Sequence, residues 1–163
     1  MTDVELRLRP PANLVSRRAK TYWTVRALGG WLVVGASETL IWLASSPSSG
    51  IALVGVTVVL AALHLFVMPR WRYRLHRWEA TDTAVYTQAG WINQERRIAP
   101  IARIQTVDTQ RGPFEQIFGL SNVTVTTASA AGPLKIHGLD RAVADTLVQD
   151  LTARAQLTRG DGT

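Results

Sequence analysis

The chain has 163 residues, contains no cysteine, and carries a formal net charge of +6 at pH 7. This length suits one small domain with an appendage, and the lack of cysteine excludes disulfides, thiolate metal sites and cysteine nucleophiles. The charge is unevenly distributed: residues 1–26 carry +4, residues 27–69 carry −1, residues 70–79 carry +3, and residues 80–163 sum to zero. Because the basic residues flank an almost uncharged stretch, they indicate membrane topology and argue against a nucleic-acid partner.

The uncharged stretch contains two apolar segments, at about 22–43 and 51–68, which are separated by the turn-forming sequence SSPSSG. A helix needs about 20 residues to cross the hydrocarbon core of a bilayer. We therefore predict a transmembrane helical hairpin over residues 21–69, preceded by a cytoplasmic segment over residues 1–20. Basic residues flank the hairpin on one side only, so the positive-inside rule places both termini in the cytoplasm. A hairpin buried in a soluble protein is the alternative, but too few residues remain to surround it.

Glu38 lies within the first predicted span, where a carboxyl group is costly and often functional. His64 in the second span is not expected to pair with it, because the two residues differ in depth by roughly 13–15 Å. Glu38 is therefore a candidate intramembrane contact. It is either protonated near the outer interface or in contact with the helix of a partner subunit.

The segment WRYRLHRW after the second span alternates apolar and basic residues, which predicts a strand with one basic face. Each basic residue near an anionic leaflet contributes about 1 kcal/mol to membrane attachment. The lipid bilayer, and its anionic leaflet in particular, is thus a predicted partner. The candidate membrane-interface residues are Arg70, Trp71, Arg72, Tyr73, Arg74 and Arg77.

The rest of the chain predicts an α+β domain over residues 70–157 and a disordered tail over residues 158–163. Its elements are short strands separated by turns, a one-turn helix and a final amphipathic helix. The strands are expected at Ala84–Ala89 and Trp91–Ala99, which flank a turn at Gly90, and at Arg103–Gln110, Asn122–Ser129 and Leu134–Leu139; the helices are expected at Pro113–Gly119 and Arg141–Ala155.

Arg103 and Gln105 lie on one face of the strand predicted at 103–110. They either satisfy backbone groups at the sheet edge or form a candidate interaction surface together with Gly112 and Pro113. The apolar residues of the following segment are expected to lie in the core and seat the short helix; these are Phe114, Ile117, Phe118 and Leu120.

Catalytic and cofactor motifs are not found in the sequence. His64, His76 and His137 are isolated, and none lies at a metal-ligand spacing. The sequence also lacks a phosphate-binding loop and a nucleophile elbow. We therefore predict no catalytic residues, no metal, no cofactor and no enzymatic activity.

Several segments occur in an order that resembles a known family: WRYRL, VYTQAGWI, RRIAPIARIQTV, GPFEQIFGL and IHGL. Together they are similar to the YdbS-like bacterial pleckstrin-homology (PH) domain membrane proteins, over nearly the whole chain. The resemblance implies a two-helix transmembrane hairpin followed by a PH-like curved antiparallel β-barrel capped by a C-terminal α-helix. It also implies a multi-pass protein of the bacterial inner membrane with no established enzymatic activity.

The expected function is that of a non-catalytic, membrane-anchored PH-like interaction or assembly module at the cytoplasmic face. The expected partners are further copies of the chain or a larger membrane relative with several PH domains. The alternative is a subunit of a hetero-oligomeric membrane complex for lipid handling or for resistance to antimicrobial agents. An obligate larger partner in mild detergent favours the subunit.

Overall fold

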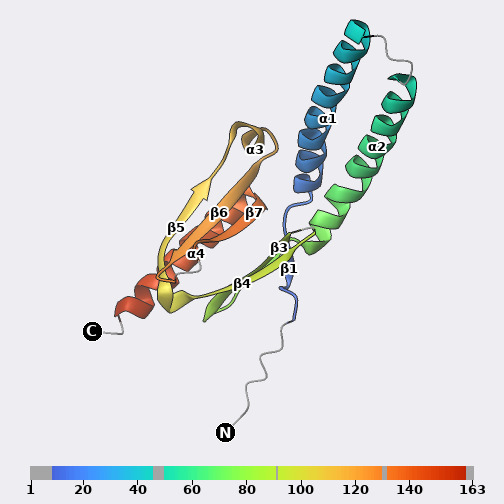
Figure 1. Ribbon diagram of the computed structural model, residues 1–163. Helices are drawn as coiled ribbons and strands as arrows, with labels where there is room; N and C mark the ends of the chain where they lie inside the picture. Colours follow the sequence, from blue (N-terminus) through green and yellow to red (C-terminus); the bar gives the residue numbers. More distant parts are fainter. Residues whose placement is uncertain (1–8, 46–49, 91, 130–131, 161–163) are drawn as a thin grey trace.

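The computed structural model describes residues 9–45, 50–90, 92–129 and 132–160. Two long helices, α1 (Arg18–Ser45) and α2 (Gly50–Leu75), run side by side and project from a domain that the other elements form (Figure 1). The other elements are, in chain order, β1 (Asn13–Leu14), which precedes α1, and then β2 (Arg77–Ala80), β3 (Ala84–Gly90), β4 (Gln94–Pro100), the 3-10 helix η1 (Ile101–Arg103), β5 (Ile104–Gln110), α3 (Pro113–Ile117), β6 (Leu120–Thr127), β7 (Leu134–Asp140) and α4 (Arg141–Gly160).

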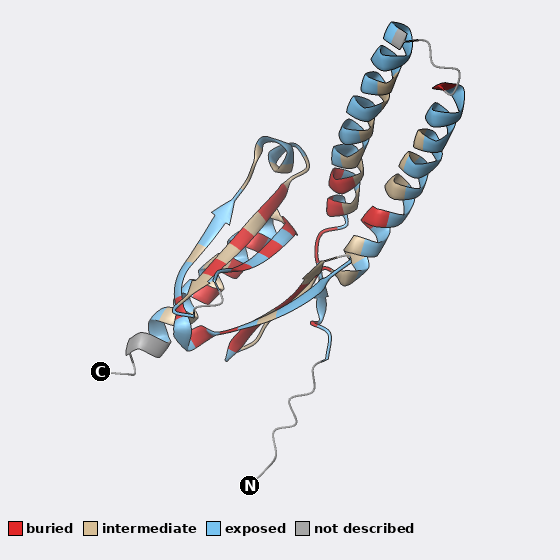
Figure 2. Cartoon of the chain, in the orientation of Figure 1, coloured by how far each residue is buried: buried red, intermediate tan, exposed pale blue. Residues whose placement is uncertain are grey.

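Helices α1 and α2 are both long and apolar enough to cross a membrane. Most of their side chains are exposed (Figure 2), with Leu40 at 68% and Ile51 at 84%. A soluble surface rarely carries so large an apolar area. The segment 51–68 of α2 rises about 27 Å, close to the roughly 30 Å thickness of a bilayer's hydrocarbon core. The predicted membrane hairpin is therefore confirmed.

The strand predicted at WRYRLHRW is wrong, because α2 continues through Pro69 to Leu75 and pairing begins only at Arg77. Alternation over so few residues does not distinguish a strand from a helix that is already propagating, and extending a helix carries no nucleation cost. Pro69 removes one backbone donor. Nearby, the Arg70 guanidinium donates to the Phe66 carbonyl at 2.7 Å.

The strands form two antiparallel sheets, in the orders β1-β2-β3-β4 and β5-β6-β7. Gly90 turns the β3–β4 hairpin with φ 119°, a conformation that a side chain disfavours. Helix α4 lies against the second sheet and η1, with Ala144, Leu147 and Leu151 buried. Among the described strands, β4 and β5 each pair on one side only, so the PH-like barrel is not closed.

Helix α4 continues to Gly160, so the predicted tail is helical at residues 158–160, while residues 161–163 lie outside the described residues. Trp91, which was expected to begin a strand, also lies outside them. The short helix α3 lies as predicted, and Gly119 follows it with φ 66°. Phe114 and Ile117 do not lie in the core, since they are 59% and 77% exposed.

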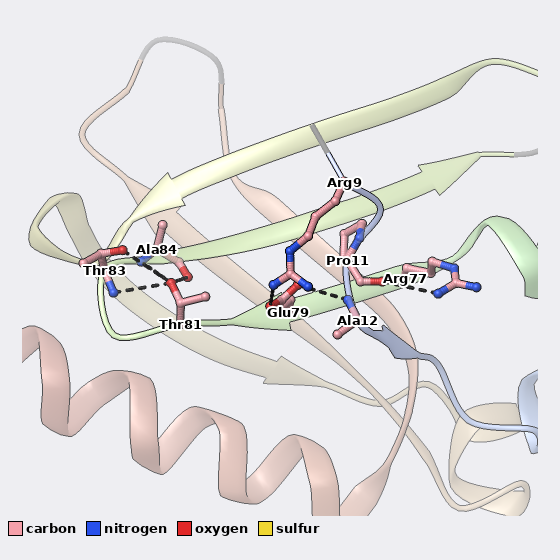
Figure 3. A network of polar contacts seen from close by, with 8 residues as sticks. All are labelled: Arg9, Pro11, Ala12, Arg77, Glu79, Thr81, Thr83 and Ala84. Atoms are coloured by element: carbon pink, nitrogen blue, oxygen red, sulfur yellow. Dashed lines mark hydrogen bonds and ion pairs between the residues drawn. The ribbon is translucent and has the colours of Figure 1, made fainter. Parts of the chain in front are cut away.

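The hairpin is joined to the domain at both ends without a linker. Only His76 separates α2 from β2. The chain before α1 is fastened to β2, where Glu79 accepts hydrogen bonds from the Arg9 side chain and from the Ala12 backbone (Figure 3). The segment just before α1 contacts β7, because the Ser16 amide donates to the Gly138 carbonyl at 2.9 Å. These contacts hold the two helices and the sheets in one arrangement.

Candidate functional site

A cavity of about 580 Å³ lies where the hairpin meets the second sheet. Both helices contribute to its wall, together with α3, β6 and β7. Helix α1 reaches it with Tyr22 and Arg26, which share one face because they are four residues apart. The polar side chains of the wall are Tyr22, Arg26, His64, Arg72, Glu115, Asn122 and His137. This junction is the candidate functional site.

Arg72 enters the cavity because α2 is helical at this point. Successive residues of a helix are rotated by about 100°, so Arg72 lies opposite Arg70 and Arg74. The Arg72 guanidinium lies above the Trp23 ring, 4.4 Å from its centroid. Arg72 and Arg26 are also close enough to repel each other. None of the ion pairs between described residues includes either arginine.

Glu115 supplies the negative charge of the cavity. Its carboxylate accepts a hydrogen bond from the Tyr22 hydroxyl at 2.9 Å. Burial raises the pKa of this carboxyl, but its own backbone amide, Tyr22, Asn122 and the Arg26 charge together outweigh burial and lower the pKa. The Tyr22 hydroxyl also accepts a longer hydrogen bond from Arg26, at 3.4 Å. Glu115 is therefore ionised near neutral pH, and the cavity carries a net charge of about +1.

Two histidines at the junction are held neutral. His76, behind the cavity, is 4% exposed, and burial lowers its pKa to about 4. The ring of His137 reaches solvent at the mouth of the cavity. Even so, desolvation by the surrounding protein lowers its pKa, and the charges of Arg72 and Lys135 act in the same direction. At pH 7 both rings are uncharged hydrogen-bonding groups.

The arrangement suits the binding of an anion more than catalysis. Two guanidiniums face a polar cavity in which the imidazole of His137 and the amide of Asn122 add hydrogen-bonding groups. These residues do not place a nucleophile beside a general base. In the described part of the chain, no group of three or more His, Asp or Glu residues could hold a metal ion.

The comparisons with known proteins agree with this architecture. A family model described as "Bacterial PH domain" matches residues 33–155, which is more than half of the chain. The chain belongs to the bacterial PH domain family. It is also 30% identical over 97 residues to the "UPF0699 transmembrane protein YdbS" of Bacillus subtilis (strain 168). That match covers 60% of this chain and 60% of the relative. No solved structure matches the chain significantly.

The chain is thus a YdbS-like member of the bacterial PH domain family, as the sequence resemblance indicated. The structure divides the predicted interface residues between two environments. Arg70, Trp71 and Arg74 are exposed at the end of α2. The others contact the protein: Arg72 enters the cavity, Tyr73 packs beneath the Lys20 ammonium, and Arg77 donates to the Pro11 carbonyl (Figure 3).

The structure does not bring the four residues of the second predicted surface together. Arg103 ends η1 and Gln105 is the second residue of β5, whereas Gly112 and Pro113 follow the other end of β5. Strand β5 has seven residues, which at about 3.3 Å each place the two pairs roughly 20 Å apart. Arg103 instead lines a cleft between β4 and the second sheet. Only Arg103 and Gln105 remain candidates for one surface.

Glu38 has a partner within its own hairpin. Its carboxyl accepts a hydrogen bond from the Thr57 hydroxyl of α2. About two helical turns closer to the domain, the indole N–H of Trp31 donates a hydrogen bond to Nδ1 of His64 at 2.9 Å. The expectation that Glu38 and His64 do not pair agrees with these contacts. A contact between Glu38 and a partner subunit's helix stays a prediction.

Sequence reasoning missed most of the junction cavity. Arg26 carried the clearest signal, because it is a charged residue inside the apolar segment that begins near residue 22. Arg72 was placed with its neighbours on one basic face, which the helical backbone separates. His137 and Glu115 carried no signal, since they reach the cavity through β7 and α3, elements far from the hairpin in sequence.

Proposed function

We propose that this bacterial PH domain protein is a non-catalytic interaction and assembly module at the cytoplasmic face of the bacterial inner membrane. The proposed orientation, with both termini in the cytoplasm, is supported by charge. Arg17, Arg18, Arg70 and Arg74 flank the domain end of the hairpin, while the sequence 45–50 at the other end carries none. Basic residues near membrane spans remain on the cytoplasmic side.

The observation that carries the assembly role is the open side of the barrel. Strands β4 and β5 each lack a second neighbour among the described strands. Most side chains of β4 are exposed, including Ile98 at 48%. A strand edge with unpaired backbone groups is a template for a strand from another chain.

A cleft of about 500 Å³ lies beside this open edge. Its wall includes Ile98 of β4, Arg103 of η1 and Leu134 of β7. Backbone pairing along β4 would supply affinity, and a cleft with both apolar and basic groups would supply specificity. The proposed occupant is a strand of a second bacterial PH domain, either from another copy or from a larger relative with several such domains.

Site-specific photo-crosslinking of the full chain in its native membrane tests the proposal. A crosslinker at Ile98 or Gln105 is expected to give a discrete product that contains a second bacterial PH domain, identified by mass spectrometry. The matched control is Val143, an exposed aliphatic residue on α4. Equal products from Val143, or only uncrosslinked monomer at all three positions, would contradict the proposal.

The assembled state gives a second readout. Ile98→Lys places a charge at the strand edge and is expected to reduce the mass of the complex measured by light scattering in mild detergent. Val143→Lys adds the same charge at an exposed position of α4 and is expected to leave the mass unchanged. If both variants retain the wild-type mass, β4 is not the assembly edge.

A further inference from the structure

The junction cavity opens beside a second, apolar groove of about 440 Å³. The two share Tyr22 and Arg26 in their walls. Past Arg26, the groove follows α1 along Leu28 and Leu32. Its other side is closed by Phe114 of α3 and by Phe118, which directly follows α3. A polar, positively charged cavity therefore continues directly into an apolar groove.

The groove lies at the level of the membrane. Leu32 is six residues beyond Arg26, so the groove extends about 9 Å along the apolar part of α1. Helix α3 lies next to this part of α1 (Figure 1), and Phe114 and Ile117 on α3 are largely exposed. Exposed apolar side chains beside a transmembrane helix suit the interfacial region of a bilayer. An occupant of both spaces would have its polar group in the cavity and its chain among lipids.

The charge of the cavity defines the polar group. Arg26 and Arg72 repel each other. Among the described residues of the cavity wall, Glu115 is the one carboxylate that opposes their charge. His64 accepts the Trp31 N–H through Nδ1, and desolvation lowers the pKa of His137, so that ring adds no charge at pH 7. A net charge of about +1 is balanced by one phosphodiester. A phosphomonoester carries more negative charge and would be repelled by Glu115.

We propose that the junction binds one singly anionic glycerophospholipid of the surrounding leaflet. Arg26 and Arg72 contact the phosphate oxygens, for which paired guanidiniums are well suited. His137 and Asn122 hydrogen-bond the hydroxyl groups of the headgroup, and one acyl chain lies in the groove between Leu32 and Phe114. The cavity volume falls within the range of small-molecule sites, about 300–1,000 Å³. A phospholipid fits both spaces, whereas inorganic phosphate leaves the groove empty.

Lipid titration of the full-length protein, followed by native mass spectrometry after delipidation in a non-ionic detergent, tests this site. Phosphatidylglycerol is expected to bind with one copy per chain, and Arg72→Gln or Arg26→Gln is expected to weaken binding about tenfold. The matched control is Arg74→Gln, an exposed arginine on the same helix, which is expected to change binding less than about twofold. An equal loss of lipid binding in Arg74→Gln would indicate diffuse electrostatic attraction and would overturn the proposed site.

Two further arms separate the headgroup from the chain. Phosphatidylethanolamine is expected to bind about tenfold more weakly than phosphatidylglycerol, and excess inorganic phosphate is expected not to displace the lipid. Phe114→Ser removes an exposed aromatic ring. It is expected to weaken the binding of long-chain phosphatidylglycerol and to leave the binding of a short-chain analogue unchanged. Equal affinity for the two headgroups, displacement by phosphate, or no effect of Phe114→Ser on the long-chain lipid would each contradict the proposal. These outcomes are independent of assembly at β4.

Discussion

His76 makes the stability of this protein depend on pH well above the range of carboxylates. The residue lies between α2 and β2, its ring is stacked at a tilt on Trp23 with centroids 5.1 Å apart, and Nδ1 lies 2.8 Å from the Arg72 carbonyl. The pKa of the ring is lowered from 6.5 to about 4, chiefly by burial and in smaller part by the charge of Arg72 and by His137, while the backbone hydrogen bond to Arg72 opposes the shift. The folded state therefore disfavours the protonated ring.

The sign of the effect follows from this lowered pKa. Between pH 6.5 and about 4 the unfolded chain binds a proton that the folded chain does not, so stability is greatest above pH 6.5 and falls as the pH decreases. Lowering the pH from 7.5 to 5.5 is expected to reduce the free energy of unfolding by about 1.3 kcal/mol. For a chain of this size that corresponds to a decrease in melting temperature of about 3–5 °C.

Thermal unfolding of the full chain in detergent, followed by tryptophan fluorescence at pH 7.5 and 5.5, measures this difference. His76→Phe keeps an aromatic ring against Trp23, and the Arg72 carbonyl still accepts the backbone amide of residue 76. The variant is expected to lose most of the pH dependence. His137→Gln is the comparison variant, because the pKa of His137 is also lowered but by less than that of His76; it is expected to retain most of the pH dependence. A wild-type pH dependence in His76→Phe would refute the reasoning.

Three other predictions concern the hairpin and its attachment. Gly138 has φ 76° and a Cβ there would lie 3.0 Å from Ala19, so Gly138→Ala should lower thermal stability by about 1–3 kcal/mol. It should do so more than Gly132→Ala, where φ is 77° and the space is open; equal losses would exclude the steric term. A double-mutant cycle of Glu38→Leu and Thr57→Val, measured by unfolding in mixed micelles, should give a coupling of about 0.6 kcal/mol; zero coupling would contradict the hydrogen bond. The full chain should remain in the membrane pellet after alkaline carbonate, whereas release into the supernatant would exclude the hairpin.

The hairpin was predictable because its signals are local. Two uninterrupted apolar segments and the charges that flank them specify spanning helices without reference to any other part of the chain. Strands β3, β6 and β7 were also anticipated within a few residues, since their turns at Gly90 and Gly132 are marked in the sequence. The end of α2 was not predictable in this way. The residues of Arg70–Leu75 suit a strand as well as a helix, and because the preceding helix is already formed, they extend it.

The junction could not be predicted, because its residues meet only in the tertiary structure. Arg26 and Arg72 come from different helices, and Glu115 and His137 come from the domain. The expectation that Phe114 would lie in the core assumed water as the only solvent. Beside a transmembrane helix an exposed apolar side chain contacts lipid instead, so the rule that places such residues in the interior does not apply there.

The backbone of residues 70–75 also determines how the basic cluster acts. On a strand, Arg70, Arg72 and Arg74 would share one face and attract the membrane together. On the helix that forms, Arg72 is turned by about 200° from Arg70 and lies over Trp23 in the cavity, while Arg74 stays exposed. Three arginines of equal formal charge thus lie in unequal environments, Arg70 and Arg74 exposed and Arg72 in the wall of the cavity. The proposed lipid site therefore predicts a difference in lipid binding between Arg72→Gln and Arg74→Gln that follows from the helical phase at the end of α2.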